Sequence, residues 1–342
     1  MPTTARLLVL AWMCLLLGVI AAKAEPPTKP ATGDSVTTLR LTWHDSARGG
    51  RAVPVTIRFS ETAAKPGPLI VFSHGLGGSR DHYEYLALHW AREGYIVVNP
   101  QHAGSDDAVW RKNPRAMQDL VKATRDPDNL TNRPRDISFV IDQMLALSND
   151  SQSPLHGRVD AQKIGVAGHS FGAYTTLVIG GQLTELPRQA SRQPWMDKRV
   201  RALIPMSAPA NARQASVKMF DPIALPTLHM TGTRDDSPIG GSVAAERRIP
   251  FDQMHRADNY LLILQEGDHA VFSAARTRGR DASRDAIHQQ LILKASTAFW
   301  NAYLRDDAAA RQWLQEKEGF LKELGKQGTF EFKAGGQPPA RE

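Results

Sequence analysis

Hydrophobic and polar positions follow two different rhythms along this chain, and the first appears near the N-terminus. Residues 36–44 and 52–59 alternate between apolar and polar side chains on either side of the polar stretch DSARGG. A period of two is typical of strands that bury one face. The pattern therefore predicts an N-terminal antiparallel hairpin.

From residue 68 onward, short apolar runs alternate with segments of helical spacing. The apolar runs predict buried strands within residues 68–78, 95–100, 164–167, 199–209, 225–236 and 259–272. The helical spacing predicts helices over residues 80–94, 136–147, 170–179, 282–304 and 307–324, and Gly94 suits the end of the first. Strands that alternate with helices are typical of a mostly parallel sheet covered on both faces. We therefore expect an α/β fold.

Some segments show neither the strand nor the helix pattern, and they help to define the boundaries of the leader and the folded domain. Residues 25–34 (EPPTKPATGD) are polar and rich in proline, and residues 103–130 are polar and irregular. We predict a flexible leader over residues 25–35, one folded domain over 36–305, and an amphipathic helix with a tail over 306–342. Apolar side chains of this last helix gather near one face, which predicts packing on the domain: Trp313, Leu314, Phe320, Leu321 and Leu324.

The first 24 residues form a separate unit. Arg6 precedes an apolar run over residues 7–22, and Ala22-Lys23-Ala24 has the small-x-small pattern of a cleavage site. The run is shorter than the roughly 20 residues of a spanning helix, so a signal peptide cut after Ala24 is predicted rather than a membrane anchor. The single cysteine, Cys14, lies inside this segment. Export of a chain without disulfides predicts a bacterial periplasmic or secreted protein.

The distribution of charge bears on whether the protein binds nucleic acid. The net charge is +7, and removal of Arg6 and Lys23 with the signal peptide leaves 7 − 2 = +5. The basic residues are scattered, and no nucleic-acid-binding motif is present in the sequence. We therefore expect no nucleic-acid partner, while the oligomeric state stays open.

A candidate nucleophile lies in the stretch KIGVAGHSFGAY, residues 163–174. Ser170 stands between Gly168 and Gly172, after an apolar run and before a helical segment. A serine held on a sharp strand-to-helix turn leaves no room for side chains two positions away, which glycine satisfies. The alternative interpretation is a plain strand-to-helix turn. The complete context favours a nucleophilic Ser170.

A serine hydroxyl needs a base, and the base needs an acid that orients it. In this strand–turn–helix context the expected chain order is serine, acid, histidine. His269 follows the apolar run YLLILQ, whereas His255 and His288 are more simply surface residues. Asp235 follows a strand that ends near Gly232. Asp236 is the neighbour that offers an alternative, and Asp268 is adjacent to the base along the chain, which is usually the wrong geometry.

Backbone N–H groups are expected to hold the negative charge that develops on a substrate oxygen. One would come from Phe171, directly after the candidate nucleophile. The other would come from Leu76 in SHGLGG (residues 73–78), where the glycines allow close approach. A phosphate-binding turn is the alternative, but the sequence lacks the lysine of a P-loop. His74 is predicted to be a structural loop residue. No metal-binding spacing is present in the sequence, so no metal and no cofactor are expected.

Several segments together resemble a known family. SHGLGGSRDHYEYLALHWAREGYIVVNPQHAGS, GHSFGAYT, TGTRDD and GDHAVF are similar to the serine α/β-hydrolases of the platelet-activating-factor acetylhydrolase-like and predicted dienelactone-hydrolase-like group. NRPRDISFVIDQM (132–144) resembles an Arg-Pro-x-Asp helix start of that group, and TAFWNAYL its closing helix. The likeness covers residues 68–305. It implies an α/β-hydrolase fold, a triad of Ser170, Asp235 and His269, and oxyanion donors at Leu76 and Phe171. Dienelactone hydrolases have cysteine where this chain has Ser170, so that name describes the fold alone.

The sequence therefore predicts a secreted serine hydrolase that cleaves small or lipid-like carboxylic esters through an acyl-enzyme. Phospholipids, polyesters and amides are alternative substrates, and the chain carries no marked apolar lipid-docking helix. The irregular residues 103–130 are a candidate cover for the pocket. A catalytically inactive binding protein of the same fold is the alternative from another class.

Overall fold

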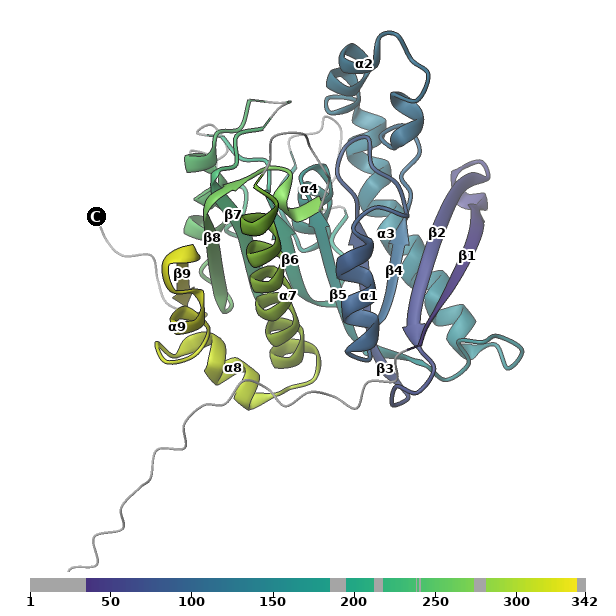
Figure 1. The fold of residues 1–342 in the computed structure, drawn as a ribbon. Coiled ribbons are helices and arrows are strands. Elements are labelled where there is room, and N and C mark those ends of the chain that lie inside the picture. Colours follow the sequence, from purple (N-terminus) through teal and green to yellow (C-terminus); the bar gives the residue numbers. More distant parts are fainter. Residues whose placement is uncertain are drawn as a thin grey trace, which may run out of the picture.

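A central sheet organises the protein (Figure 1). The computed structural model describes residues 35–184, 195–211, 218–237, 239, 241–273 and 281–336. In this part of the chain the sheet has nine strands in the order β1-β2-β4-β3-β5-β6-β7-β8-β9. Their bounds are β1 Val36–Asp45, β2 Arg51–Ser60, β3 Gly67–Ser73, β4 Ile96–Pro100, β5 Val159–His169, β6 Val200–Met206, β7 Thr227–Arg234, β8 Asn259–Asp268 and β9 Gly328–Lys333. The predicted signal peptide and nearly all of the predicted leader lie outside the described residues.

The strand directions confirm the predicted fold class. Neighbouring strands from β4 through β3 to β8 pair in parallel, whereas β1 pairs antiparallel with β2 as the predicted hairpin. The strands predicted from the sequence do not include β9, which pairs antiparallel with β8. Its alternation of Phe330 and Phe332 is short, but both rings stack on Tyr260 of β8. This contact between distant segments holds β9 in place, and the local sequence pattern alone does not predict the strand.

Helices cover both faces of the sheet (Figure 1). On one face α1 (Glu84–Arg92) and α7 (Ala282–Leu304) pack through residues such as Trp90 and Trp300. On the other, α3 (Pro127–Asn149) and α4 (Phe171–Ile179) pack through residues such as Ile137 and Leu177. Because both faces are buried, the central strands read as continuous apolar runs rather than as alternating ones.

The predicted helix over residues 307–324 is wrong as a single element. It is two helices, α8 (Ala308–Gln315) and α9 (Phe320–Leu324). A Cβ added at Gly319, between them, would lie 1.9 Å from the carbonyl oxygen of Trp313, so the chain turns back on itself where only glycine fits. The apolar side chains still face inward, because Trp313, Leu314, Phe320 and Leu324 are buried, while Leu321 is exposed.

The segment over residues 103–130 is also more regular than predicted. It contains a 3₁₀ turn (Asp107–Val109) and α2 (Ala116–Ala123), and α3 begins at Pro127, nine residues before the predicted start at 136. Asp126 caps this helix by accepting from the N–H of Asp128, and proline suits its first turn. Pro134 reads as a helix start in the sequence but lies inside the helix.

The remaining described elements are short. They are η1 (Ser46–Arg48), η3 (Ala244–Arg248), α6 (Ile249–Gln253), η4 (Val271–Ser273) and η5 (Gly325–Gln327). Within the described ranges no helix combines the length and apolar character needed to cross a membrane. The carboxyl ends of β5, β7 and β8 lie at the same edge of the sheet, and the candidate site is built there.

Candidate active site

Ser170 occupies a sharp turn between β5 and α4. Its φ of 56° and ψ of −116° are strained for a residue with a side chain. A Cβ at Gly168 would lie 2.4 Å from the carbonyl oxygen of Gly172, and a Cβ at Gly172 would lie 1.9 Å from that of Ser73. Only glycine fits at both positions, so the Gly-x-Ser-x-Gly pattern follows from steric crowding around the serine.

The structure brings the three predicted triad residues together from the ends of three strands. His269 Nε2 lies 3.0 Å from Ser170 Oγ, and His269 Nδ1 lies 2.7 Å from Asp235 Oδ1. Both distances are in hydrogen-bond range. The Asp235 side chain is fully buried, whereas that of His269 is 18% exposed. A carboxylate only accepts, so Nδ1 of the neutral ring carries the proton and Nε2 is free to accept from the serine hydroxyl.

Asp235 is held in place by several further groups. Its Oδ2 accepts from the hydroxyls of Ser207 (2.5 Å) and Thr231 (2.8 Å). The guanidinium of Arg247 lies 3.4 Å from Oδ1 and also donates to the carbonyl oxygens of Asp235, Ser207 and Ala208. No sequence signal marked Arg247, which reaches the site from η3 on a separate segment.

The other candidate acids have local structural contacts. Asp236 accepts from the backbone N–H of Ala244 at 2.9 Å. Asp268 accepts from the backbone N–H of Ala270 at 3.0 Å, just past the base. Both contacts stabilise turns and neither is made to the His269 ring.

The predicted oxyanion donors lie on either side of Ser170. Phe171 is the first residue of α4, where backbone N–H groups have no intrahelical acceptor. Leu76 lies in the loop after β3, and both residues line the same pocket as Ser170 and His269. Neither backbone N–H donates to another residue in the described part of the chain. Both are available to a substrate oxygen.

The pocket has a volume of about 850 Å³. Ser170 and His269 line it together with both apolar and polar side chains, and the polar ones include Asp81, Glu84 and Arg125. The apolar and aromatic residues that line it include Leu76, Leu130, Tyr174, Pro209, Ile239, Tyr83 and Tyr85. Thr124 and Arg125, from the segment that the sequence analysis placed over the pocket, also line it.

His169 and Tyr83 form a second polar chain behind the base. His169 Nε2 lies 2.9 Å from the carbonyl oxygen of His269, and Nδ1 lies 2.8 Å from the Tyr83 hydroxyl. Burial, together with the charges of His269 and Arg247, holds the pKa of His169 well below 6.5. A carbonyl only accepts, so the neutral ring carries its proton on Nε2 and Tyr83 donates to Nδ1. The Tyr83 oxygen in turn accepts from the N–H of Gly75 at 3.3 Å.

We expect Tyr83→Phe to lower kcat for p-nitrophenyl esters by about tenfold, because one buried hydrogen bond contributes roughly 1–1.5 kcal/mol. The hydroxyl links the N–H of Gly75 to the ring of His169, which in turn donates to the carbonyl oxygen of His269, so its loss loosens the loops of Leu76 and His269. Steady-state kinetics on the purified variant checks this. Tyr85→Phe is the matched control, because the Tyr85 hydroxyl donates to the carbonyl oxygen of Phe272 instead. Equal effects of the two variants would contradict the expectation.

His288 and His255 were both predicted to be surface residues, and the structure differs for His288. His288 was predicted at the surface but is fully buried on α7. It continues the inward stripe through Leu291, Ile292 and Ala295, and the i, i+3, i+4 spacing of that stripe is the signal that would have found it. His255 lies in the loop after α6 and is half-buried. Neither lines the pocket.

No set of three or more His, Cys, Asp or Glu side chains is arranged to hold a metal ion in the described ranges. The arrangement that is present, a serine next to a histidine that is next to a buried aspartate, suits nucleophilic attack on a carbonyl carbon.

Comparison with known proteins gives one family and two groups of relatives. Residues 68–318, well over half of the chain, match the family described as PET hydrolase-like. Cutinase 2 of Thermobifida cellulosilytica is 27% identical over 107 residues, which cover 30% of this chain and 40% of the cutinase. The platelet-activating factor acetylhydrolase of Cavia porcellus is 24% identical over 153 residues, covering 38% of this chain and 35% of the relative. That of Canis lupus familiaris is 28% identical over 137 residues, covering 32% and 31%. The chain thus spans about 40% or less of the length of these relatives.

Proposed function

The chain belongs to the PET hydrolase-like family, and we propose that it is a serine hydrolase that cleaves carboxylic esters. The observation that carries this proposal is the hydrogen-bonded series Ser170–His269–Asp235, whose first two members line a pocket of about 850 Å³. The resemblance to platelet-activating-factor acetylhydrolases, stated from the sequence, is confirmed by the relatives found, and the family description adds polyester hydrolases to the comparison.

The proposed reaction has two steps that use the same groups. His269 Nε2 takes the proton of Ser170 Oγ as this oxygen attacks the ester carbonyl carbon, and Asp235 stabilises the imidazolium that forms. The N–H groups of Leu76 and Phe171 donate to the resulting oxyanion. The C–O bond to the alcohol then breaks, and the alcohol leaves with the proton from His269. Water, activated in the same way, hydrolyses the acyl-enzyme and restores the serine.

The pocket supports esters with an apolar acyl or alcohol part. Its wall includes aliphatic and aromatic side chains such as Leu130, Tyr174 and Ile239 beside polar and charged ones. Its volume of about 850 Å³ is large for a short acetyl group alone. A polyester is the second candidate, favoured by the family description and by relatives named cutinases. A phospholipid, by analogy with the acetylhydrolase relatives, is the alternative within this class.

A fluorophosphonate probe followed by an acyl-chain-length series tests the proposal. The probe should label Ser170 in the native protein, as read by peptide mass spectrometry, and p-nitrophenyl esters from acetate to octanoate should be hydrolysed. A catalytically inactive binding protein of the same fold would show neither. Release of soluble acids from a polyester film, compared with release of acetate or fatty acid from phospholipid vesicles, separates the remaining substrate classes.

Export through a signal peptide is part of the proposal. Residues 1–24 have the charge and apolar pattern of such a signal. Intact-mass analysis of the exported protein should give a chain that begins at Glu25. A mass that retains Met1 would contradict cleavage and favour an anchored protein.

A further inference from the structure

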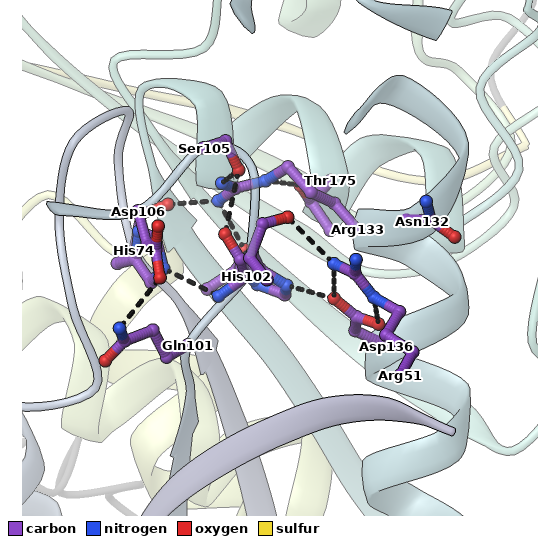
Figure 2. A network of polar contacts seen from close by, with 12 residues as sticks. Arg51, His74, Gln101, His102, Ser105, Asp106, Asn132, Arg133, Asp136 and Thr175 are labelled. Carbon is purple, nitrogen blue, oxygen red and sulfur yellow. Dashed lines mark hydrogen bonds and ion pairs between the residues drawn. The ribbon is translucent and has the colours of Figure 1, made fainter. Parts of the chain in front are cut away.

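The Arg-Pro-x-Asp motif of α3 holds a buried arginine, Arg133, and Figure 2 shows it among the side chains of the surrounding polar network. Arg133 is fully buried, and burial lowers its pKa to about 9, so it stays cationic at neutral pH. Its acceptors are three hydroxyls and one backbone carbonyl, none of which is charged. Asp136, the acid of the motif, instead pairs with Arg48 and Arg51. Burial of this cation costs free energy, which the nearby carboxylates of Asp136 and Asp106 offset in part, whereas its own hydrogen bonds go to neutral groups in three separate segments.

The guanidinium joins three segments that are far apart in the sequence. Nη2 donates to the carbonyl oxygen of His74 and to Ser73 Oγ (3.1 Å) at the end of β3. Nη1 donates to Ser105 Oγ (2.8 Å) in the loop after β4. Nε donates to Thr175 Oγ1 (3.0 Å) on α4. A planar fork with five N–H donors suits such a junction, and a lysine ammonium does not reproduce it.

Two of these segments carry the proposed oxyanion donors. The Thr175 hydroxyl donates to the carbonyl oxygen of Phe171 at 3.0 Å, and the guanidinium lies 4.5 Å from the centre of the Phe171 ring. Arg133 therefore fixes the first turn of α4, where the Phe171 N–H points out of the helix. On the other side, the carbonyl oxygen of Ser105 accepts from the N–H of Gly77, next to Leu76.

The donor and the acceptor of each hydrogen bond around the Leu76 peptide can be assigned in only one way. The N–H of His102 can only donate, so His74 Nε2 accepts it (3.0 Å) and the proton of the His74 ring lies on Nδ1. Nδ1 then donates to the carbonyl oxygen of Gly75 (2.7 Å), which also accepts from the N–H of Gly78. This carbonyl belongs to the same peptide unit as the Leu76 N–H. Its two donors fix the plane of that peptide and hence the direction of the N–H.

The donor and acceptor roles of the His102 ring can be assigned in the same way. Its Nδ1 lies 3.0 Å from the carboxylate of Asp136, which can only accept, and its Nε2 lies 3.0 Å from Ser73 Oγ. Burial, with the charge of Arg133, lowers the pKa of His102 to about 4, so the ring is neutral and Nε2 accepts the Ser73 proton. The Ser73 oxygen is then left to accept from Arg133. The hydrogen bonds therefore form a continuous series from Asp136 through His102 and Ser73 to Arg133, which also donates to the carbonyl oxygen of His74.

We propose that Arg133 is a positioning residue for the oxyanion hole, which holds the Leu76 and Phe171 N–H groups at a fixed separation and direction. This proposal rests on the proposed function, since it concerns the same hydrolytic site. Arg133 does not line the pocket and acts only through the backbone segments that it joins.

Arg133→Gln tests this through the difference between transition-state and ground-state effects. We expect kcat for p-nitrophenyl butyrate to fall by about 10- to 100-fold, somewhat less than the loss of a whole donor, while KM changes by less than about threefold. The inhibition constant of an alkylboronic acid, which forms a tetrahedral adduct with the serine, should rise by the same factor as kcat falls. Arg133→Lys, which keeps the charge but reaches fewer acceptors, should lie between Gln and the native enzyme.

The matched control is Arg305→Gln at the opposite end of the strands. Arg305 also donates to a backbone carbonyl, that of Glu93, and also packs over a ring, that of Tyr95. It should lower Tm without lowering kcat. If folded Arg133→Gln keeps kcat within about twofold of the native enzyme, or if the boronic acid affinity does not change, the proposal is wrong.

A second variant covers the case in which Arg133→Gln does not fold. Thr175→Val keeps the side-chain shape but removes the hydroxyl between Arg133 and the Phe171 carbonyl, and kcat should fall by about tenfold with KM unchanged. An unchanged kcat would overturn the proposal. Ser170→Ala is measured beside these variants. If it does not abolish hydrolysis, the proposed function fails, whereas a native activity that requires Ser170 but not Arg133 or Thr175 refutes the positioning role alone.

Discussion

Ser170→Ala is expected to lower kcat for p-nitrophenyl acetate by at least about 10⁴-fold while the protein stays folded. The serine oxygen is the only protein atom in the proposed mechanism that forms a covalent bond to the carbonyl carbon of the substrate. Alanine keeps the Cβ of Ser170 and removes only the hydroxyl, so the turn before α4 need not move. Stopped-flow and steady-state assays measure the rate, and thermal unfolding measures Tm, which should change by only a few degrees.

Ser237→Ala is the matched control for this variant. Ser237 lines the same pocket, but its hydroxyl donates to the carbonyl oxygen of Ile239 and makes no contact with His269. Its kcat should stay within about threefold of the native value. A Ser170→Ala protein with undiminished turnover would refute the nucleophile assignment and with it the proposed function.

Asp235→Asn should lower kcat by about 10³–10⁴-fold without a comparable change in KM. The variant keeps the size of the side chain but removes the negative charge that faces the imidazolium. Arg247 lies 3.3 Å from His269 Nδ1, so its positive charge would then oppose formation of the imidazolium with no carboxylate between them. The pH–rate profile and kcat at pH 7–9 measure the effect.

Asp236→Asn separates the two neighbouring carboxylates. Asp236 accepts from the N–H of Ala244, and an asparagine oxygen can keep that contact. Its kcat should remain within about twofold of the native value. If Asp236→Asn inactivated the protein and Asp235→Asn did not, the acid in the proposed triad would have to be reassigned.

The strand ends explain how much of the candidate site could be predicted from the sequence. Ser170, Asp235 and His269 each follow an apolar run that forms β5, β7 or β8. Parallel strands place their carboxyl ends at one edge, so residues that follow such runs meet in space although they are far apart along the chain. The steric need for glycine beside Ser170 is also local. The fold class, and the sharp turn that carries Ser170 between a strand and a helix, could therefore be predicted from the sequence.

The residues that support the site were not readable in the same way. Arg247, Tyr83 and Arg133 approach it from η3, the start of α1 and the middle of α3, and each is defined by the groups that it contacts. The Arg-Pro-x-Asp motif marked Arg133 only as part of a helix start. Arg247 and Tyr83 carry no local pattern that distinguishes them from ordinary surface or core residues. The true start of α3 at Pro127 was missed for a related reason, because Pro134 is tolerated inside a helix that tertiary contacts hold.

Local sequence thus determined which segments form strands, which residues stand at their ends, and why glycines flank Ser170, because each of these depends on neighbours within a few residues. The tertiary structure alone decided that β9 pairs with β8, that His288 faces the core, and that Arg133 joins β3, α4 and the loop after β4. These features depend on the free energy of side-chain contacts between segments at least 28 residues apart along the chain. The hydrophobic pattern predicts the shared edge of the parallel strands but does not specify these individual contacts.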